Sequence, residues 1–269
     1  MAVPLTIGII TAGRPGCLER CIGSVRTHVT TPHHMVVLDS LANPELEATW
    51  AAAEDVTYRA APRPVGPSAA RRLIAEALET PRLLYLDDDI EVRPGTVEAL
   101  MTYLDTHDGV DIATGVWNEY DQYRMMGQFF VEGEQGETPI VTKKFLTVEA
   151  ADAVGLSSAR VDGGLATMLL RAEVLEAVQF DPRYDFYYEL YDFFMQCKRA
   201  GMNVQAVRKA VFDHKPVAYL DETERQRSDT EVDKERFAEK WGLQPIGSVG
   251  GVQRTLWERV LHKVRRFWS

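Results

Sequence analysis

Short apolar runs alternate with segments of helical periodicity along the first half of the chain. The apolar runs are rich in β-branched and aliphatic residues, as buried strands are, and they cover residues 4–11, 34–40, 56–61 and 83–86. Segments with apolar side chains at helical spacing lie between them, at residues 17–28, 45–53 and 67–80. Strands that alternate with helices predict an α/β domain, in which a mostly parallel central sheet is flanked by helices.

The second half of the chain has a less regular pattern. A strand is expected within 109–120, and one or two strands within 204–214. Helices are predicted at residues 172–178, 188–201 and 234–241. Residues 118–145 are rich in glycine, polar and aromatic residues, and EGEQGE at 132–137 is interpreted as a turn or mobile loop. The charged stretch 221–235 is interpreted as a solvated loop.

Composition narrows the range of partners and compartments. The chain of 269 residues is 45% hydrophobic, enough for a sizeable core, and its net charge of -10 argues against a nucleic-acid partner. Its three cysteines lack metal-binding spacing and fit a reducing cytoplasm. The sequence shows no signal peptide and no apolar stretch of about 18 residues. We therefore expect a cytoplasmic protein, either soluble or peripheral at the inner face of the membrane.

The apolar run at 83–86 ends in three consecutive carboxylates, Asp87, Asp88 and Asp89. Since side chains alternate along a strand, Asp87 and Asp89 are expected to point the same way. Two carboxylates about 7 Å apart repel each other by about 2 kcal/mol at an effective dielectric of about 20. A divalent cation is the simplest group that offsets this repulsion, because Mg²⁺ and Mn²⁺ prefer oxygen ligands and share them with substrate phosphates.

Two other polar residues stand where strands are predicted to end. Thr11 closes the first apolar run, and Asp39 closes the second. In α/β sheets, ligands bind beyond the carboxyl ends of the strands. We therefore expect Thr11, Asp39 and the three aspartates to meet in one crevice.

The order of the motifs resembles that of the family 2 glycosyltransferases, which have the GT-A fold. The motifs that carry the resemblance are TAGRP at 11–15, Asp39, the Ala-Arg-Arg segment at 70–72, LDDDIEVRPG at 86–95 and the stretch from VDGG to YELYDFF at 161–194. The resemblance covers roughly residues 4–242. Two positions depart from the family pattern, since Arg72 replaces the usual Asn and Leu190 replaces an acidic residue.

The resemblance implies a fold, a domain organisation and an activity. It implies a single GT-A domain at 1–242, with a nucleotide-sugar-binding half at 1–110 and an acceptor-side half at 111–220, followed by a tail at 243–269. The implied reaction is metal-dependent transfer of a sugar from a nucleoside diphosphate sugar, UDP being favoured, to an acceptor hydroxyl, with inversion. A glycan, a lipid-linked or a small-molecule acceptor would each fit.

The resemblance also implies roles for individual residues. The implied ligands of Mn²⁺ or Mg²⁺ are Asp87, Asp89 and His214. The residues implied to bind the nucleotide sugar are Thr11, Arg14, Asp39, Arg71, Asp87, Asp88 and Gly164. Glu189 is the first candidate for the catalytic base and Asp192 the second. Their spacing of three residues in a predicted helix places both on one face, so that one could orient the other.

Residues 252–269 form a separate feature at the end of the chain. Apolar side chains recur at four-residue intervals, and the local charge is positive, opposite to that of the whole chain. Such a basic amphipathic helix can lie on an anionic membrane surface. Docking on the domain itself or on a second subunit, as in a homodimer, is an equal alternative.

Two other functions compete with glycosyl transfer. A nucleotidyltransferase would also use an α/β sheet and acidic metal ligands, although it usually has a longer Gly-rich loop followed by a lysine. A nucleotide-sugar-binding or scaffold protein without catalysis is the second alternative, because Leu190 departs from the acceptor motif. Turnover with a productive acceptor separates these functions.

Overall fold

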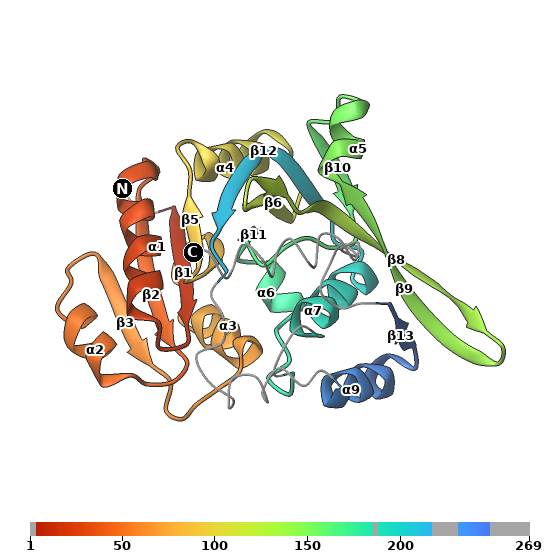
Figure 1. Cartoon of the computed structure of the whole chain (residues 1–269), viewed down its shortest axis with the longest axis horizontal. Helices are drawn as coiled ribbons and strands as arrows, with labels where there is room; N and C mark the ends of the chain where they lie inside the picture. The colour runs from red at the N-terminus through yellow and green to blue at the C-terminus, as the bar shows by residue number, and fades with distance from the viewer. Residues whose placement is uncertain (1–3, 185–187, 217–230, 248–269) are drawn as a thin grey trace.

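The computed structural model describes residues 4–184, 188–216 and 231–247 (Figure 1). Within these ranges, ten strands form the main sheet. Four neighbouring strands of this sheet are parallel, in the order β3 (Val56–Ala60), β2 (His33–Asp39), β1 (Leu5–Thr11) and β4 (Arg82–Asp87). The strands predicted in the first half of the chain are therefore confirmed, together with their parallel arrangement.

The sheet continues beyond β4 in a mixed arrangement. The next strands in order are β11 (Met168–Arg171), β6 (Ile112–Glu119), β12 (Val204–His214) and β10 (Ser158–Val161). Strand β11 is antiparallel to both of its neighbours, whereas β6 and β12 are parallel to each other. Two short strands, β5 (Ile90–Val92) and β7 (Gln122–Tyr123), pair with β12 and β6. Residues 204–214 thus form a single strand.

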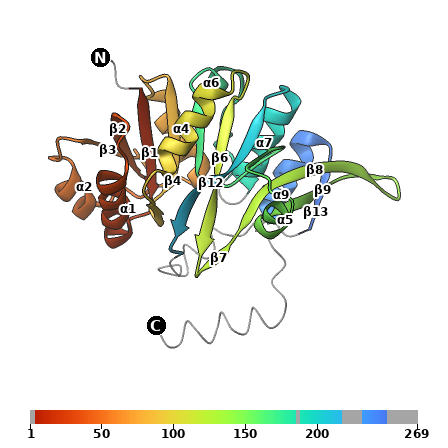
Figure 2. The ribbon, with the colours of Figure 1, turned by 90° about the horizontal axis from the view of Figure 1, so that it is seen from above.

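Helices cover both faces of the main sheet, as Figures 1 and 2 show. One core contains side chains of α1 (Pro15–His28), α2 (Pro44–Trp50) and α4 (Thr96–Thr106), together with alternate residues of β1 such as Ile7 and Ile9. The other core contains α3 (Pro67–Glu76), α6 (Val174–Ala177) and α7 (Tyr188–Arg199), together with Leu83 and Tyr85 of β4. The alternation of strand side chains therefore divides the apolar residues between two layers.

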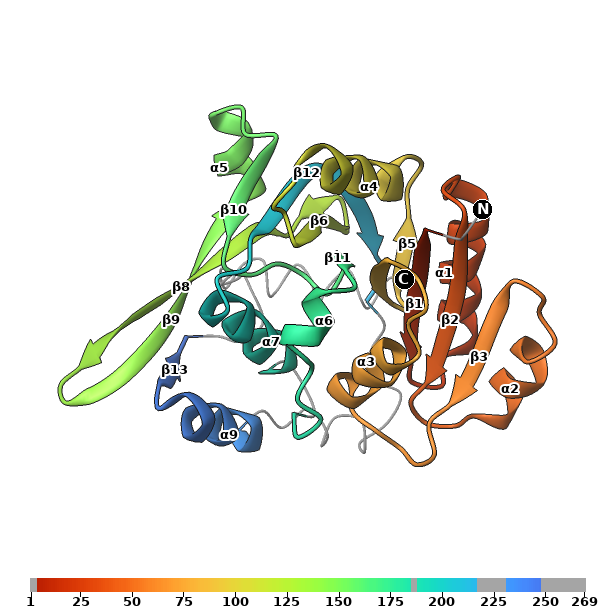
Figure 3. The same cartoon turned by 180° about the vertical axis from the view of Figure 1, so that it is seen from behind.

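A second sheet lies beside the main one and corrects one sequence interpretation. Residues 125–147, where no strand was predicted, form a long hairpin of β8 (Met125–Gln135) and β9 (Thr138–Thr147) that projects from the body (Figures 1 and 3). Its turn at 136–137 lies within the stretch 132–137 interpreted as a turn or mobile loop, whereas residues 132–135 belong to β8. Gly136 has a φ of 65°, which suits the first position of a two-residue hairpin turn. Glycine at that position is typical of a hairpin turn, but the segment contains so many glycine and polar residues that this one did not stand out.

Three further elements lie beside the hairpin and α7. Helix α5 (Val148–Ala153) follows the hairpin, and β13 (Gln244–Ile246) joins β9 as a parallel strand. Helix α9 (Glu231–Trp241) covers α7, so residues 231–235 are helical, and the solvated-loop interpretation is wrong for them. The rest of that loop and the tail at 252–269 lie outside the described residues. The division of the chain near residue 110 stays a prediction.

Glycine at position 115 is required by the close approach of β6 and β12. A Cβ atom on Gly115 would lie 2.7 Å from Cδ2 of Phe212 and 2.8 Å from the carbonyl oxygen of Ala210. Because the backbone carbonyl has no room to move, we expect Gly115→Ala to lower the free energy of unfolding by about 1–3 kcal/mol. Gly133→Ala is the control, since open space surrounds Gly133. Urea denaturation that gives equal stabilities for the two variants would contradict this account.

Candidate active site

Three neighbouring strands end at the same edge of the main sheet and bring the predicted residues together. Thr11 of β1 pairs in register with Asp39 of β2, and Ile10 pairs with Asp87 at the end of β4. The hydroxyl of Thr11 donates to Oδ2 of Asp88 over 2.5 Å, so the ends of β1 and β4 are joined by a side-chain hydrogen bond. Thr11, Asp39 and the three aspartates therefore lie at one edge of the sheet, as the sequence predicted.

Asp88 is the most deeply buried of the three consecutive aspartates, with 1% of its surface exposed. Its carboxylate accepts hydrogen bonds from Nε and Nη2 of Arg14, the residue before α1, the former over 3.1 Å. Burial raises the pKa of Asp88 to about 7, and the charge of Arg14 and the Thr11 hydroxyl act in the opposite direction. Arg14 therefore offsets part of the cost of burying a charge at this position.

Asp89 lies between two positively charged partners. Its Oδ2 is 3.4 Å from Nη1 of Arg14 and 3.7 Å from Nε2 of His214, the last residue of β12. Burial opposes ionisation of Asp89, but the hydrogen bond and charge of His214, with the charge of Arg14, outweigh it and lower the pKa. On its other side, Nδ1 of His214 lies 3.1 Å from Oε2 of Glu119. Glu119 thus leaves Nε2 directed toward Asp89.

Glu119 and Arg124 were not among the residues singled out in the sequence. Arg124, the residue after β7, donates from Nε to Oε2 of Glu119, the last residue of β6. Burial opposes ionisation of Glu119, but the hydrogen bonds from His214 and Arg124 lower its pKa to about 2. Burial also lowers the pKa of His214, yet its two carboxylate partners raise it overall to about 9. No local sequence pattern predicts this contact, because 95 positions separate Glu119 from His214.

Asp87 faces a different partner, which corrects the expected alternation. Strand β4 ends at Asp87, and Asp88 and Asp89 belong to a turn before β5. Because a turn does not keep the two-residue period of a strand, Asp88 and Asp89 share Arg14, whereas Asp87 accepts from Nη2 of Arg71 over 2.7 Å. Asp87 and Asp89 therefore have separate cationic partners.

Arg71 connects the acidic turn to helix α7. It is 2% exposed, and its Nη1 donates to Oε1 of Glu189 over 3.3 Å while Nη2 holds Asp87. The guanidinium carbon also lies 5.7 Å from the ring centroid of Phe180. Arg71 is thus a buried bridge between the end of β4 and the first turn of α7, which excludes the interpretation of a surface ion pair.

Glu189 carries a carboxylate oxygen that makes no hydrogen bond. The residue is 6% exposed, and Oε2 has no hydrogen-bond partner among the described residues. Burial raises the pKa of Glu189, while the charge of Arg71 acts against this increase. A buried carboxylate with a raised pKa and one oxygen without a partner among the described residues is a candidate for proton acceptance.

Asp192 makes contacts of a different kind. Its carboxylate accepts from Nε2 of Gln196 over 2.8 Å, from Nζ of Lys240 over 2.8 Å and from Nε1 of Trp241 over 2.9 Å. It is fully buried, and burial raises its pKa against the effect of these donors. The contacts join α7 to α9, and none of them joins Asp192 to Glu189. The idea that the two carboxylates orient each other therefore gains no support from their partners.

Two residues implied to bind the nucleotide sugar, Asp39 and Gly164, make contacts within the protein that give each of them a structural role. Asp39 is fully buried and accepts from the backbone N–H groups of Leu41 and Asn43 and from the Tyr58 hydroxyl, the last over 2.7 Å. A Cβ atom on Gly164 would lie 2.5 Å from Oγ1 of Thr114. Asp39 thus shapes the loop after β2, and Gly164 permits close packing on β6.

The residues suggested as metal ligands fit an ion that takes most of its ligands from substrate and water. Among the described residues, no three His, Cys, Asp or Glu side chains form a group that could hold a metal ion by themselves. Asp89 and His214 nevertheless face each other, and Nε2 of His214 would give up its proton to bind an ion while its Nδ1–H stays with Glu119. Mg²⁺ commonly binds through one or two carboxylates plus phosphates, so a protein cage of three ligands is not required.

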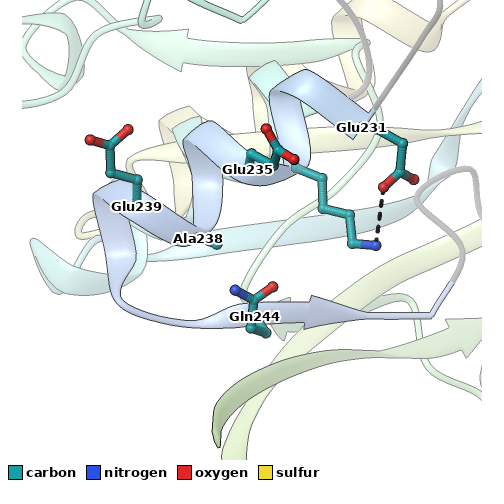
Figure 4. A pocket seen from close by; sticks show the side chains of 6 residues that line it. Glu231, Glu235, Ala238, Glu239 and Gln244 are labelled. Carbon is teal, nitrogen blue, oxygen red and sulfur yellow. Dashed lines mark hydrogen bonds and ion pairs between the residues drawn. The ribbon is translucent and has the colours of Figure 1, made fainter.

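A hollow on the surface lies away from these residues. It is lined by α9 and β13, through Glu231, Lys234, Glu235, Ala238, Glu239 and Gln244, and Figure 4 shows an ion pair between Lys234 and Glu231. None of the candidate site residues lines it. The chemistry described above therefore belongs to the strand ends and not to this hollow.

Comparison with known proteins decides the family. The model of the family described as "Glycosyl transferase family 2" matches residues 6–152, more than half of the chain. The chain belongs to glycosyl transferase family 2. The matched range includes Thr11, Arg14, Arg71 and the three aspartates, so the resemblance drawn from their order is confirmed. Family membership also disfavours the nucleotidyltransferase alternative.

Solved structures show that this family 2 glycosyltransferase has the GT-A fold. The crystal structure of GalNAc-T7 with UDP, GalNAc and Mn²⁺ matches 97% of this chain at 14% identity, with a TM-score of 0.64. The crystal structure of S. aureus TarS 1-349 matches 80% of this chain at 12% identity, with a TM-score of 0.53. The chain spans 54% and 59% of the lengths of these two proteins.

Two further findings concern the relatives of this glycosyltransferase and its contact with membranes. No curated protein matches the sequence. No helix in the described ranges is long and apolar enough to cross a membrane. The suggested membrane contact and the suggested homodimer depend on residues 252–269, outside the described ranges, and they stay predictions.

The Arg71 bridge provides a test of this geometry. Arg71→Met leaves Asp87 and Glu189 buried without their shared cation, so we expect the free energy of unfolding to fall by about 3–5 kcal/mol. Replacing Glu189 by Gln in the same protein should recover part of the loss, because one buried charge is then removed. Urea denaturation measures both effects.

Arg72→Met is the matched control for this experiment. Arg72 is the next residue of α3, and its ion pair with Glu76 is exposed. Such pairs contribute little, so the stability should change by no more than about 0.5 kcal/mol. Equal losses for the Arg71 and Arg72 variants would rule out a buried bridge.

Proposed function

We propose that this family 2 glycosyltransferase moves a sugar from a nucleoside diphosphate sugar to an acceptor hydroxyl, with Glu189 as the base. The observation that carries the proposal is the Arg71 bridge. One guanidinium holds both Asp87, at the end of β4, and Glu189, whose Oε2 has no hydrogen-bond partner in the part of the chain that the structure describes. The bridge supports a site in which the donor diphosphate and the acceptor hydroxyl meet beside the same strand end.

The reaction is a displacement at the anomeric carbon of the donor sugar. The acceptor oxygen forms a bond to this carbon as the bond to the diphosphate oxygen breaks, and the electron pair leaves with the nucleoside diphosphate. Oε2 of Glu189 accepts the proton that the acceptor hydroxyl loses. A single displacement of this kind inverts the configuration at the anomeric carbon.

Negative charge develops on the diphosphate as it leaves, and a positive charge nearby stabilises it. Mn²⁺ or Mg²⁺, held by Asp89 and His214 with Asp87 nearby, would neutralise this charge as a Lewis acid. Arg14 keeps Asp88 and Asp89 in place from the other side, since its guanidinium contacts both carboxylates. The presence of UDP and Mn²⁺ in the GalNAc-T7 crystal structure favours UDP as the nucleotide and Mn²⁺ as the ion here.

The remaining candidates have supporting roles in this proposal. Thr11 and Asp39 shape the edge that receives the nucleotide, because each fixes the backbone or carboxylate next to it. Asp192 fixes the orientation of α7 through Lys240 and Trp241. The acceptor is a hydroxyl compound, and a glycan, a lipid-linked sugar or a small molecule would each satisfy this chemistry.

The role of Glu189 predicts a specific kinetic change. Glu189→Gln keeps the shape of the side chain but removes its basicity, so kcat should fall by about 10²–10⁴-fold. The affinity for the donor should change little, because Glu189 does not hold the diphosphate. Single-turnover rates and donor titrations, measured with wild-type protein beside the variant, test this split. An unchanged rate would place the base elsewhere.

The role of Asp89 predicts loss of metal-dependent binding. Mutating a residue that contacts a ligand of a metal site typically lowers the metal affinity by about 10–100-fold. Asp89 is proposed as a direct ligand, so Asp89→Asn should weaken Mn²⁺-dependent donor binding by at least that factor. Removal of Mn²⁺ by a chelator should have the same effect on the wild-type protein. Glu91→Gln is the control, since Glu91 lies two residues away and pairs with Arg20 at the surface.

The products distinguish the competing functions. Release of nucleoside diphosphate with a glycosylated acceptor supports the transferase. Formation of a nucleotide sugar from a nucleoside triphosphate and a sugar phosphate, with release of pyrophosphate, would support a nucleotidyltransferase. Donor binding without any turnover would support a binding protein, the alternative that Leu190 raised.

A further inference from the structure

The imidazole of His214 has an aromatic contact in addition to its two carboxylate partners. The ring centroid of Trp117, a residue of β6, lies 4.2 Å from that of His214, and the two ring planes are inclined by 33°. At this separation the indole is in van der Waals contact with a face of the imidazole. Two carboxylates therefore lie at the ring nitrogens of His214, and Trp117 lies against a ring face.

The pairing of β6 with β12 explains this contact. The two strands are parallel neighbours (Figure 1), and Trp117 pairs in register with Phe212. Residues paired in register point to the same side of a sheet, and so do residues two positions apart on one strand. Trp117 and His214 therefore share one side of the sheet, and Glu119, two positions after Trp117, joins them there.

The indole of Trp117 is itself held in place. Its Nε1 donates to Oγ1 of Thr167 over 2.8 Å, and Thr167 is fully buried. The backbone of Thr167 is fixed too, because its carbonyl oxygen accepts from the N–H group of Gly115 over 3.2 Å. Trp117 is half-buried and packs against the apolar core that contains Phe212. The indole is thus a fixed surface for the imidazole.

A hydrogen bond at one nitrogen does not fix the plane of an imidazole. The terminal torsion of a histidine side chain has a broad energy profile, so the ring can rock about it. The contact of 3.1 Å between Nδ1 of His214 and Glu119 tolerates such rocking, since hydrogen bonds weaken steeply only at angles below about 120°. An aromatic ring against the imidazole face resists it sterically. Trp117 therefore supplies a constraint that Glu119 does not.

We propose that Trp117 is a positioning residue for His214, which holds the imidazole plane so that Nε2 stays directed toward Asp89, where the metal ion would bind. The inference rests on the proposed function, in which Mn²⁺ or Mg²⁺ binds to Asp89 and His214. Trp117 touches neither the ion nor the diphosphate in this assignment and acts only through His214.

The test measures how much Mn²⁺ raises the affinity of the full chain for UDP, by calorimetric titration of UDP with and without the ion. Trp117→Met removes the aromatic face, so the effect of Mn²⁺ should fall by about tenfold, as when a contact to a metal ligand is lost. UDP binding without Mn²⁺ should be unchanged. Trp117→Phe keeps an aromatic face and should retain most of the Mn²⁺ effect. A wild-type Mn²⁺ effect in Trp117→Met would overturn the proposal.

Two further variants guard against a general loss of stability. Trp117→Leu also lacks an aromatic ring, so it should give the same loss and replaces Trp117→Met if that variant does not fold. Tyr103→Met is the matched control, because Tyr103 stacks on His107 at the end of α4 with ring centroids 4.1 Å apart, outside the candidate site. It should keep the wild-type Mn²⁺ effect. Equal losses in the Trp117 and Tyr103 variants would overturn the proposal.

A double-mutant cycle with His214→Ala separates this inference from the proposed function. His214→Ala should lower the Mn²⁺ effect, and adding Trp117→Met should cause no further loss, because Trp117 acts only through His214. A further loss of the same size would overturn the positioning role alone. A Mn²⁺ effect that His214→Ala leaves unchanged would refute the metal site of the proposed function, and this inference with it.

Discussion

Burial of consecutive carboxylates at the end of β4 is the constraint on which the rest of the site depends. Asp88 is almost completely buried, and Asp87 and Asp89 are close to it in the chain. Charges at this spacing repel each other strongly in a medium of low dielectric, so the fold must supply cations. It supplies Arg14 beside α1 and Arg71 from α3, together with His214 at the end of β12. The site is therefore assembled from elements far apart in the sequence.

The three cations divide the acidic turn into two parts with different surroundings. Arg14 and His214 hold Asp88 and Asp89 on one side, where a diphosphate and its ion would be held. Arg71 turns Asp87 toward Glu189 on the other side, where the acceptor would lose its proton. This division follows from the end of β4 at Asp87, since the turn after it directs the next two carboxylates away. In the proposed mechanism, the side that holds the leaving group and the side that holds the base would thus diverge between Asp87 and Asp88.

The sequence predicted those parts of the molecule that local patterns determine. The parallel strands, their flanking helices and the meeting of Thr11 with Asp88 follow from periodicity and from the geometry of α/β sheets. The pairing of Glu119 with His214 and that of Arg71 with Glu189 join residues 95 and 118 positions apart, which no local pattern encodes. The hairpin was missed because glycine and charged residues dominate its composition. The prediction that the side chains of Asp87 and Asp89 point the same way was wrong, because Asp89 lies in a turn.

The placement of Glu189 on a helix, and not on a loop, has a physical consequence. Asp192 anchors α7 to α9, and Lys198 anchors it to the hairpin, so both sides of the helix are fixed. Because a helix transmits such constraints along its length, the first turn that carries Glu189 is held relative to β4. If Glu189 is the base, as proposed, it would lose little conformational freedom when an acceptor binds, which is the condition for efficient positioning of reacting groups. The departure at Leu190 leaves this arrangement intact, since neither anchor involves that residue.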